Sequence, residues 1–148
     1  MAIQFLRAAQ RDFPVVDDYI RLWTGEALLN LGNAKQAADM FESIPQTVPD
    51  SSLLTKAAYR SGEAWYQASS CPEATAWFAK AVELDDKEPG APQALLRRGA
   101  CQLRDNNISE GRETLMQLWV RFAYSAEAKE AEALLASKIG RASCRERV

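Results

Sequence analysis

The chain has 148 residues, of which 47% are apolar and 26% are charged, so it is long enough and apolar enough to form one domain with a core. Its formal net charge of −2 argues against nucleic-acid binding. The chain has no histidine, which removes the commonest general base and metal ligand. No apolar run reaches the length of about 18 residues that spans a bilayer, and the N-terminal stretch turns polar too early for a signal peptide. We therefore expect no membrane span, no metal site and no cofactor.

Residues 1–13 are predicted to hold one helix, over about residues 2–12, before Pro14 interrupts the chain. We interpret this helix as the second member of an incomplete preceding helix pair. Residues 14–137 are then expected to form a repeat domain.

A period of 37 residues is the main feature of this domain. Gly25, Gly62 and Gly99 lie 37 residues apart, and each is followed at five matching offsets by residues of matching types. These are a helix-capping residue, an amide or acid, a very small residue, a large apolar residue and a second apolar residue. In order, they are Asn33, Gln36, Ala37, Phe41 and Ile44; Ser70, Glu73, Ala74, Phe78 and Ala81; and Asn107, Glu110, Gly111, Leu115 and Leu118. A period kept over three copies is typical of a stacked repeat array.

Each copy is predicted to form two antiparallel helices. The first helices are expected at about residues 16–31, 52–68 and 91–105, and the second helices at about residues 34–44, 71–84 and 108–122. The second helices are expected to begin with capping boxes headed by Asn33, Ser70 and Asn107. Tight turns are expected at Gly32, Ser69 and Asn106, and prolines such as Pro45 are expected between the repeats.

The repeated glycines lie in the middle of the first helices, where glycine costs up to about 1 kcal/mol relative to alanine. We infer that each glycine lets the paired helix approach closely through a small facing residue. The facing residues expected are Ala37, Ala74 and Gly111. The large residues that follow them, Phe41, Phe78 and Leu115, are expected to fill the space one turn beyond.

The C-terminal part of the chain is expected to be incomplete. Residues 125–136 are predicted to begin a fourth first helix, in which the period places a small residue at Ala136. Residues 138–148 then lack an apolar helical stripe, turn basic and resemble vector-derived sequence. We interpret residues 138–148 as a non-native tail.

The cysteines and serines do not predict chemistry. Cys71, Cys101 and Cys144 are odd in number, far apart and without a C-x-x-C pair, so we expect unpaired thiols rather than a zinc site or a disulfide framework. A serine triad is excluded because no histidine is present to activate the hydroxyl.

The acids and tryptophans have ordinary interpretations as well. Asp17-Asp18 and Asp85-Asp86 suggest a carboxylate dyad or, as we favour, a solvated helix start and an inter-repeat loop. Among the tryptophans, Trp65 and Trp77 are expected in the core, whereas Trp23 and Trp119 fit either core or surface.

The offsets from each glycine resemble those of the tetratricopeptide repeat, with a small residue twelve positions on, an aromatic residue sixteen on and an aliphatic or small residue nineteen on. The family's proline is present as Pro49 in the first copy, and the period of 37 exceeds the usual 34. The bulky residue expected three positions on is Leu28 and then Trp65, but Gln102 in the third copy. The resemblance implies an all-α fold of antiparallel helix pairs stacked in a right-handed superhelix.

A narrower resemblance links three segments to bacterial cell-envelope repeat proteins. The segments begin at Asp18, Pro49 and Leu118, and the last contains the turn Ala123-Tyr124-Ser125 without the family's proline. Such segments occur in the helical N-terminal part of soluble lytic transglycosylases, in outer-membrane-assembly lipoproteins and in Tol–Pal-associated proteins. The resemblance implies a periplasmic location, and the sequence itself leaves a cytoplasmic one open.

The tetratricopeptide resemblance also implies a binding surface, because the first helices of such arrays line a concave groove. Carried over by offset from each glycine, the partner-binding stripe consists of Tyr19, Glu26, Asn30, Lys56, Glu63, Gln67, Gln93 and Arg104. Its amides and mixed charges suit hydrogen bonding to an extended peptide better than capture of a terminal carboxylate. The alternative interpretation is a merely solvated surface.

We therefore expect a non-catalytic protein-interaction or scaffolding domain whose partner is a protein or an extended peptide. The favoured context is the helical part of an envelope protein such as a peptidoglycan lytic transglycosylase, in which a missing downstream domain would carry the catalytic glutamate. A stand-alone tetratricopeptide adaptor in outer-membrane or cell-division assembly is the alternative. A self-contained enzyme would instead need a buried acid with a raised pKa in a closed pocket.

Overall fold

The computed structural model describes residues 2–145, together with the side chains of these residues other than 11, 12 and 138–145. The described residues contain eight α-helices, one 3-10 turn and no strand. In chain order the elements are α1 (Ala2–Asp12), η1 (Pro14–Val16), α2 (Asp17–Asn30), α3 (Ala34–Thr47), α4 (Leu54–Gln67), α5 (Cys71–Leu84), α6 (Ala91–Arg104), α7 (Ile108–Arg121) and α8 (Ala126–Arg145). The predicted all-α fold is confirmed, and its right-handed superhelical stacking stays a prediction.

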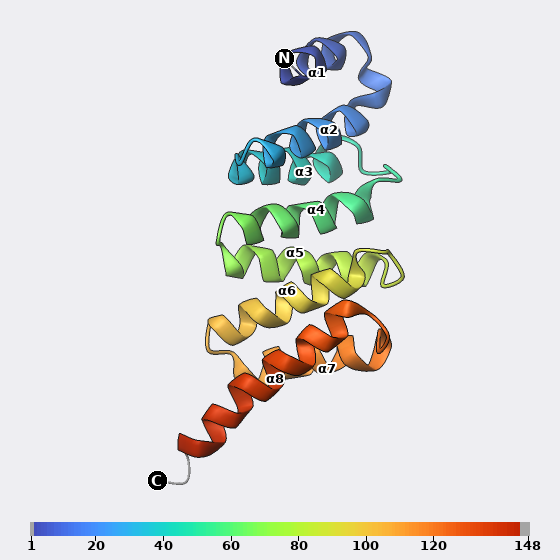
Figure 1. The fold of residues 1–148 in the computed structure, drawn as a ribbon. Helices are drawn as coiled ribbons and strands as arrows, with labels where there is room; N and C mark the ends of the chain where they lie inside the picture. The colour runs from blue at the N-terminus through green and yellow to red at the C-terminus, as the bar shows by residue number, and fades with distance from the viewer. Residues whose placement is uncertain (1, 146–148) are drawn as a thin grey trace. The chain divides into compact units, whose positions relative to one another are not determined.

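The chain divides into two compact units, and the first of them is Met1–Asp86. In this unit α2 and α3 form one helix pair, α4 and α5 form the next, and α3 packs against α4 (Figure 1). α1 packs against α2. One hydrophobic core joins the two pairs, because Leu22, Phe41 and Ile44 cluster with Ala57 and Ala64 of α4.

The second unit is Lys87–Val148, in which α6 and α7 form the third helix pair and α8 packs against both. Leu95, Leu115, Leu118 and Ala131 are fully buried. α8 begins where the sequence predicts a fourth first helix, and it continues past Ala136 to Arg145. Residues 146–148 lie outside the described part of the chain, and the assignment of residues 138–148 to a non-native tail stays a prediction.

The position of Pro45 differs from the sequence prediction. The sequence places this proline in a turn between repeats, whereas it lies inside α3. The last turn of α3 continues past it because Val48 N–H donates to Ile44 O at 2.8 Å and the Thr47 hydroxyl donates to Ser43 O at 2.9 Å. Near a helix end, the single bond that proline removes is therefore tolerated.

All three helix pairs turn through the same backbone motif. Gly32, Ser69 and Asn106 have φ values of 79°, 62° and 66°, in the left-handed region. In the first pair, Gly32 N–H donates to Leu29 O at 3.0 Å and Asn33 N–H donates to Leu28 O at 2.9 Å. These two bonds define a Schellman motif, and their counterparts recur after α4 and α6.

This motif corrects the prediction of capping boxes. Asn33, Ser70 and Asn107 are the N-cap residues of α3, α5 and α7, as predicted, but none of them makes a side-chain capping bond. The N–H of each cap residue already donates to a carbonyl of the preceding helix. Because this N–H is already bonded, the amide or acid three positions after the cap residue cannot accept from it and complete a capping box.

Close packing at the repeated glycines is confirmed, with a different partner from the one expected. A methyl group at Gly62 would lie 2.5 Å from Phe78 Cδ1. The equivalent side chains, Phe41 at Gly25 and Leu115 at Gly99, take the same space. The large apolar residue, rather than the small facing one, is what requires a glycine.

The expectation of unpaired thiols is wrong for Cys71 and Cys101, each of which is disulfide-bonded and buried. Disulfide formation depends on the distance and direction between two Cβ atoms in the fold. The number and spacing of cysteines along a chain do not report that distance. The side chain of Cys144 lies outside the described residues.

Candidate binding face of the first helices

In the first unit, the predicted stripe follows one side of α2 and one side of α4. Its exposed members there are Tyr19, Asn30, Lys56 and Gln67, and its half-buried members are Glu26 and Glu63. An ion pair between Glu26 and Arg60 ties the two helices together. In the second unit, the predicted residues Gln93 and Arg104 are exposed on α6. We call the side of α2 and α4 that carries the six stripe residues of the first unit the α2–α4 face.

The α2–α4 face contains a further position that the prediction omitted, two residues before each glycine. Trp23 and Arg60 hold this position, and Trp23 is 55% exposed. The helical spacing of residues in the sequence would have identified this position. Tyr19, Trp23 and Glu26 are spaced i, i+4 and i+7, and such residues lie along one side of a helix.

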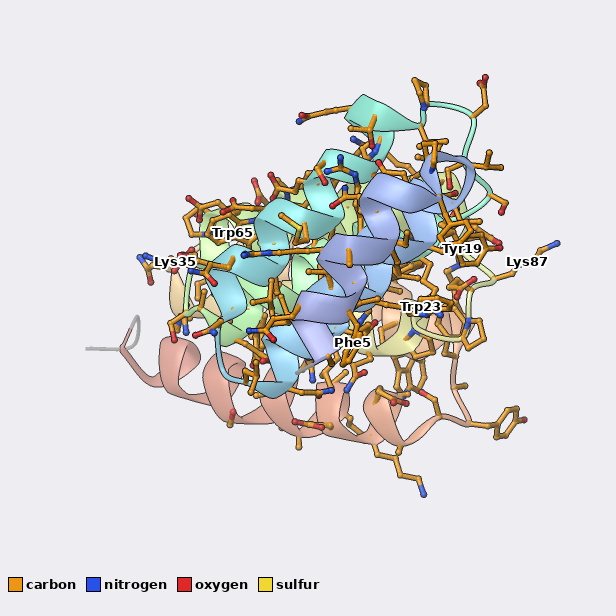
Figure 2. All side chains as sticks on the ribbon, turned by 90° about the horizontal axis from the view of Figure 1, so that it is seen from above. Phe5, Tyr19, Trp23, Lys35, Trp65 and Lys87 are labelled. Carbon is orange, nitrogen blue, oxygen red and sulfur yellow. The ribbon has the colours of Figure 1, made fainter. Side chains whose placement is uncertain are left out.

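Tyr19 and Trp23 form an exposed aromatic pair near the start of α2. Their ring centroids are 6.0 Å apart, with an angle of 59° between the ring planes. Figure 2 shows both side chains on one side of the first unit, with Trp65 and Lys35 on the other side. Two neighbouring aromatic side chains that remain 41% and 55% exposed indicate a surface suited to a partner.

Two hydrogen bonds within the α2–α4 face involve its carboxylates. Glu26 Oε2 accepts from Arg60 Nη2, and Glu63 Oε1 accepts from Gln67 Nε2 at 3.2 Å. Both members of the Glu26–Arg60 pair are partly exposed, and such pairs contribute roughly 0–1 kcal/mol to stability. A ligand can therefore compete for either member at small cost.

A hollow of about 340 Å³ lies where the turn between α2 and α3 approaches the end of α4. Gln67 and Ala68 of α4 line it together with Gly32, Asn33 and the first turn of α3. The first turn of a helix leaves backbone N–H groups without helical partners, and Asn33 provides no side-chain cap there. The hollow therefore offers hydrogen-bond donors beside the Gln67 amide.

The paired acids at the start of α2 have structural partners. Asp17 accepts from Arg21 Nε and from Gln10 Nε2, both at 2.6 Å. Asp18 is buried and accepts from the Ser51 hydroxyl, so it joins α2 to the loop before α4. The expectation of a solvated helix start is therefore wrong for Asp18, because a residue distant in sequence covers it.

The remaining tryptophans divide between packing and surface. Trp65 is half-buried, and its indole N–H donates to Glu42 Oε1 of α3 at 2.5 Å. Trp77 is half-buried with the Lys80 ammonium 4.5 Å from its ring centroid. Trp119 of α7 is 49% exposed. The expected core positions of Trp65 and Trp77 are thus reached in part.

Residues 19–51 match the family model described as Tetratricopeptide repeat. The match begins at Tyr19, spans α3 and ends at Ser51, so it covers the first helix pair. No curated protein sequence matches the chain. Together with the helix pairs, the match shows an all-α, tetratricopeptide-like repeat array, and tetratricopeptide repeats are modules that bind proteins or peptides.

Neither a membrane-spanning helix nor a metal-binding group is found in the part of the chain that the structure describes. None of its helices has both the length and the apolar character needed to cross a membrane. Nor do three or more His, Cys, Asp or Glu side chains gather there in a way that suits a metal ion.

Proposed function

We propose that the first unit binds an extended peptide of a protein partner along the α2–α4 face. The observation that carries the proposal is the exposed Tyr19–Trp23 pair, which offers aromatic surface at the start of α2. Asn30 and Gln67 lie at the other ends of the same two helices, with the Glu26–Arg60 pair between. A peptide along this face would meet aromatic, charged and amide groups in turn.

The chemistry of this face suits an internal peptide segment. An amide side chain offers an NH2 group that donates and a carbonyl oxygen that accepts, which matches the alternating groups of an extended backbone. Exposed aromatic rings provide the kind of anchor that dominates many peptide interfaces. The charges of Glu26, Lys56, Arg60 and Glu63 are mixed in sign, so the face does not favour a terminal carboxylate over an uncharged backbone.

A random dodecapeptide library displayed on phage tests this proposal. Peptides selected on the whole chain are titrated by calorimetry against the wild-type protein and the Trp23→Ala variant. We expect Trp23→Ala to weaken binding at least about tenfold, which is about 1.4 kcal/mol, because truncating an aromatic anchor removes its contact area. Gln67→Ala is expected to weaken the same peptides.

Trp119→Ala is the matched control, since Trp119 is similarly exposed but lies on α7 of the second unit. This variant should bind the selected peptides as the wild type does. Peptides that keep full affinity for both Trp23→Ala and Gln67→Ala would contradict the proposal. So would an equal loss of affinity with Trp119→Ala.

We also propose that the chain works in an oxidising compartment, as the periplasmic helical part of an envelope protein such as a peptidoglycan lytic transglycosylase. The disulfide-bonded state of Cys71 and Cys101 supports the compartment, because disulfides persist in the bacterial periplasm and are rare in the cytosol. The resemblance of the segments at Asp18, Pro49 and Leu118 to envelope proteins supports the context.

Thiol trapping in intact cells tests the compartment. The chain carries Cys144→Ser, so that Cys71 and Cys101 are its remaining cysteines. Cells are quenched with acid, and the protein is treated with a maleimide–polyethylene glycol before or after reduction. We expect a mass shift after reduction alone. Labelling of both cysteines without reduction would contradict the proposed compartment.

A further inference from the structure

The third helix pair differs from the first two at three buried or half-buried positions. These lie one before, three after and fifteen after the repeated glycine. In the first two pairs they hold Thr24, Leu28 and Met40, and then Ser61, Trp65 and Trp77; in the third pair they hold Arg98, Gln102 and Thr114. Each change makes the position larger and charged, or exchanges an apolar side chain for a polar one.

The three replacements line one cavity between α6 and α7. Its volume is about 180 Å³, and it opens to solvent beside its other lining residues, the exposed Glu110, Glu113 and Gln117. All six belong to the second unit. The three changed residues are separated in sequence but line the same cavity. We therefore interpret them as parts of one site rather than as independent substitutions.

Hydrogen bonds orient the buried part of the lining. Gln102 and Thr114 are buried, and the Thr114 hydroxyl donates to Gln102 Oε1 at 2.7 Å. The Gln102 Nε2 group is therefore turned toward Glu110 Oε2, at 3.5 Å. That distance is too long for a strong hydrogen bond, so the Gln102 amide keeps donor capacity for an occupant.

Arg98 adds a second donor to the lining. Its side chain lines the cavity, and a guanidinium carries N–H donors and no acceptor.

We propose that this cavity binds a primary carboxamide, as carried by the Asn or Gln side chain of a partner polypeptide. A carboxamide has a carbonyl oxygen that accepts and an NH2 group that donates. The lining supplies donors from Arg98 and Gln102 and carboxylate acceptors from Glu110 and Glu113. A single small group thus satisfies both sides of the cavity.

The charges of the lining select against anionic ligands. An anion would meet the two carboxylates of Glu110 and Glu113, which outnumber the single guanidinium of Arg98. A carboxamide avoids this repulsion and, unlike a cation, has an acceptor oxygen for the donors of Gln102 and Arg98. The inference does not depend on the proposed peptide face, because every lining residue lies on α6 or α7.

A titration of the isotope-labelled whole chain with propionamide, followed by NMR, tests the proposal. We expect saturable shifts of the Gln102 and Gln117 side-chain NH2 signals, with a Kd of the order of millimolar, as suits so small a ligand. At equal ionic strength, propionate is expected to bind at least about tenfold more weakly because it meets two carboxylates, and propylammonium is expected to bind more weakly because it has no acceptor for the Gln102 and Arg98 donors.

The double variant Gln102→Leu/Thr114→Met gives the third pair the residues of the first pair, Leu28 and Met40, which pack together in a core. It should fold and lose propionamide binding. Ser109→Leu is the control, since Ser109 is exposed on α7 and lies outside the cavity lining. This control should bind as the wild type does.

The proposal is overturned by any of three results. The first is an absence of saturable shifts, which means that the cavity holds water alone. The second is binding that survives the double variant. The third is propionate or propylammonium binding as tightly as propionamide. Loss of peptide binding at Trp23→Ala has no bearing on these outcomes.

Discussion

A large apolar side chain occupies the space beside each of the three glycines that head the repeats. A glycine in a helix interior is costly, so its recurrence at one offset in the sequence predicts close packing. The identity of the packed partner depends on side-chain direction. The Phe78 ring crosses the helix pair and takes the space that a methyl group at Gly62 would occupy. Ala74 is fully buried, but its atoms are not among the three nearest to that space.

Gly62→Ala is expected to lower the free energy of unfolding by roughly 1–3 kcal/mol, because the added methyl overpacks against Phe78. Urea unfolding followed by circular dichroism measures it. In a Phe78→Ala background, where the ring is absent, the same change should be neutral or stabilising by up to about 1 kcal/mol through helix propensity. Equal destabilisation in both backgrounds would show that the ring is not the cause.

Ser51→Ala is expected to lower the free energy of unfolding by roughly 1.5–3 kcal/mol, since it removes a hydroxyl donor from the buried Asp18 carboxylate. Ser52→Ala is the control, because Ser52 is the adjacent exposed serine. Its effect should stay within about 0.5 kcal/mol. Similar midpoints of thermal unfolding for the two variants would contradict the role of Ser51.

At the scale of elements, the turns inside the helix pairs follow from local chemistry. Gly and Asn tolerate the left-handed region, and two of the three turn residues, Gly32 and Asn106, are of these types. The sequence located the turns and the following caps correctly. The Schellman bonds then took the cap N–H groups, which decided against the capping boxes.

Asn106→Val tests the left-handed turn. A β-branched residue at a φ of 66° is expected to destabilise the third pair by roughly 1–2 kcal/mol. Asp105→Val is the control, because Asp105 is exposed and its φ of −81° suits any residue. The two free energies of unfolding are compared in urea. A larger loss at Asp105 than at Asn106 would be inconsistent with a Schellman turn here.

At the scale of the whole molecule, the end of the repeat domain lies within or after α8. Its buried residues Ala128 and Ala131 belong to the part that the sequence assigned to a fourth repeat. The helix nevertheless continues to Arg145. Helix formation requires local propensity, whereas a contribution to stability requires burial, and the two need not end at the same residue.

Deleting residues 138–148 is expected to leave the Tm within about 3 °C of the intact chain, equivalent to less than about 1 kcal/mol. Thermal unfolding followed by circular dichroism measures the shift. A deletion that begins at Ala128 removes buried residues of α8 and should lower the Tm clearly. If the shorter deletion is as damaging, residues 138–148 belong to the repeat domain.

The sequence by itself determined the helix pairs, their period and their turns, because caps, glycine and apolar periodicity act between residues close together in the chain. It also located six of the predicted partner-binding residues on the linked helices α2 and α4. Tertiary structure alone decided the contacts between distant residues. Ser51 covers Asp18, Arg60 pairs with Glu26, and Gln102 meets Thr114 at a cavity. Such contacts depend on distances across the fold, which no spacing along a chain reports.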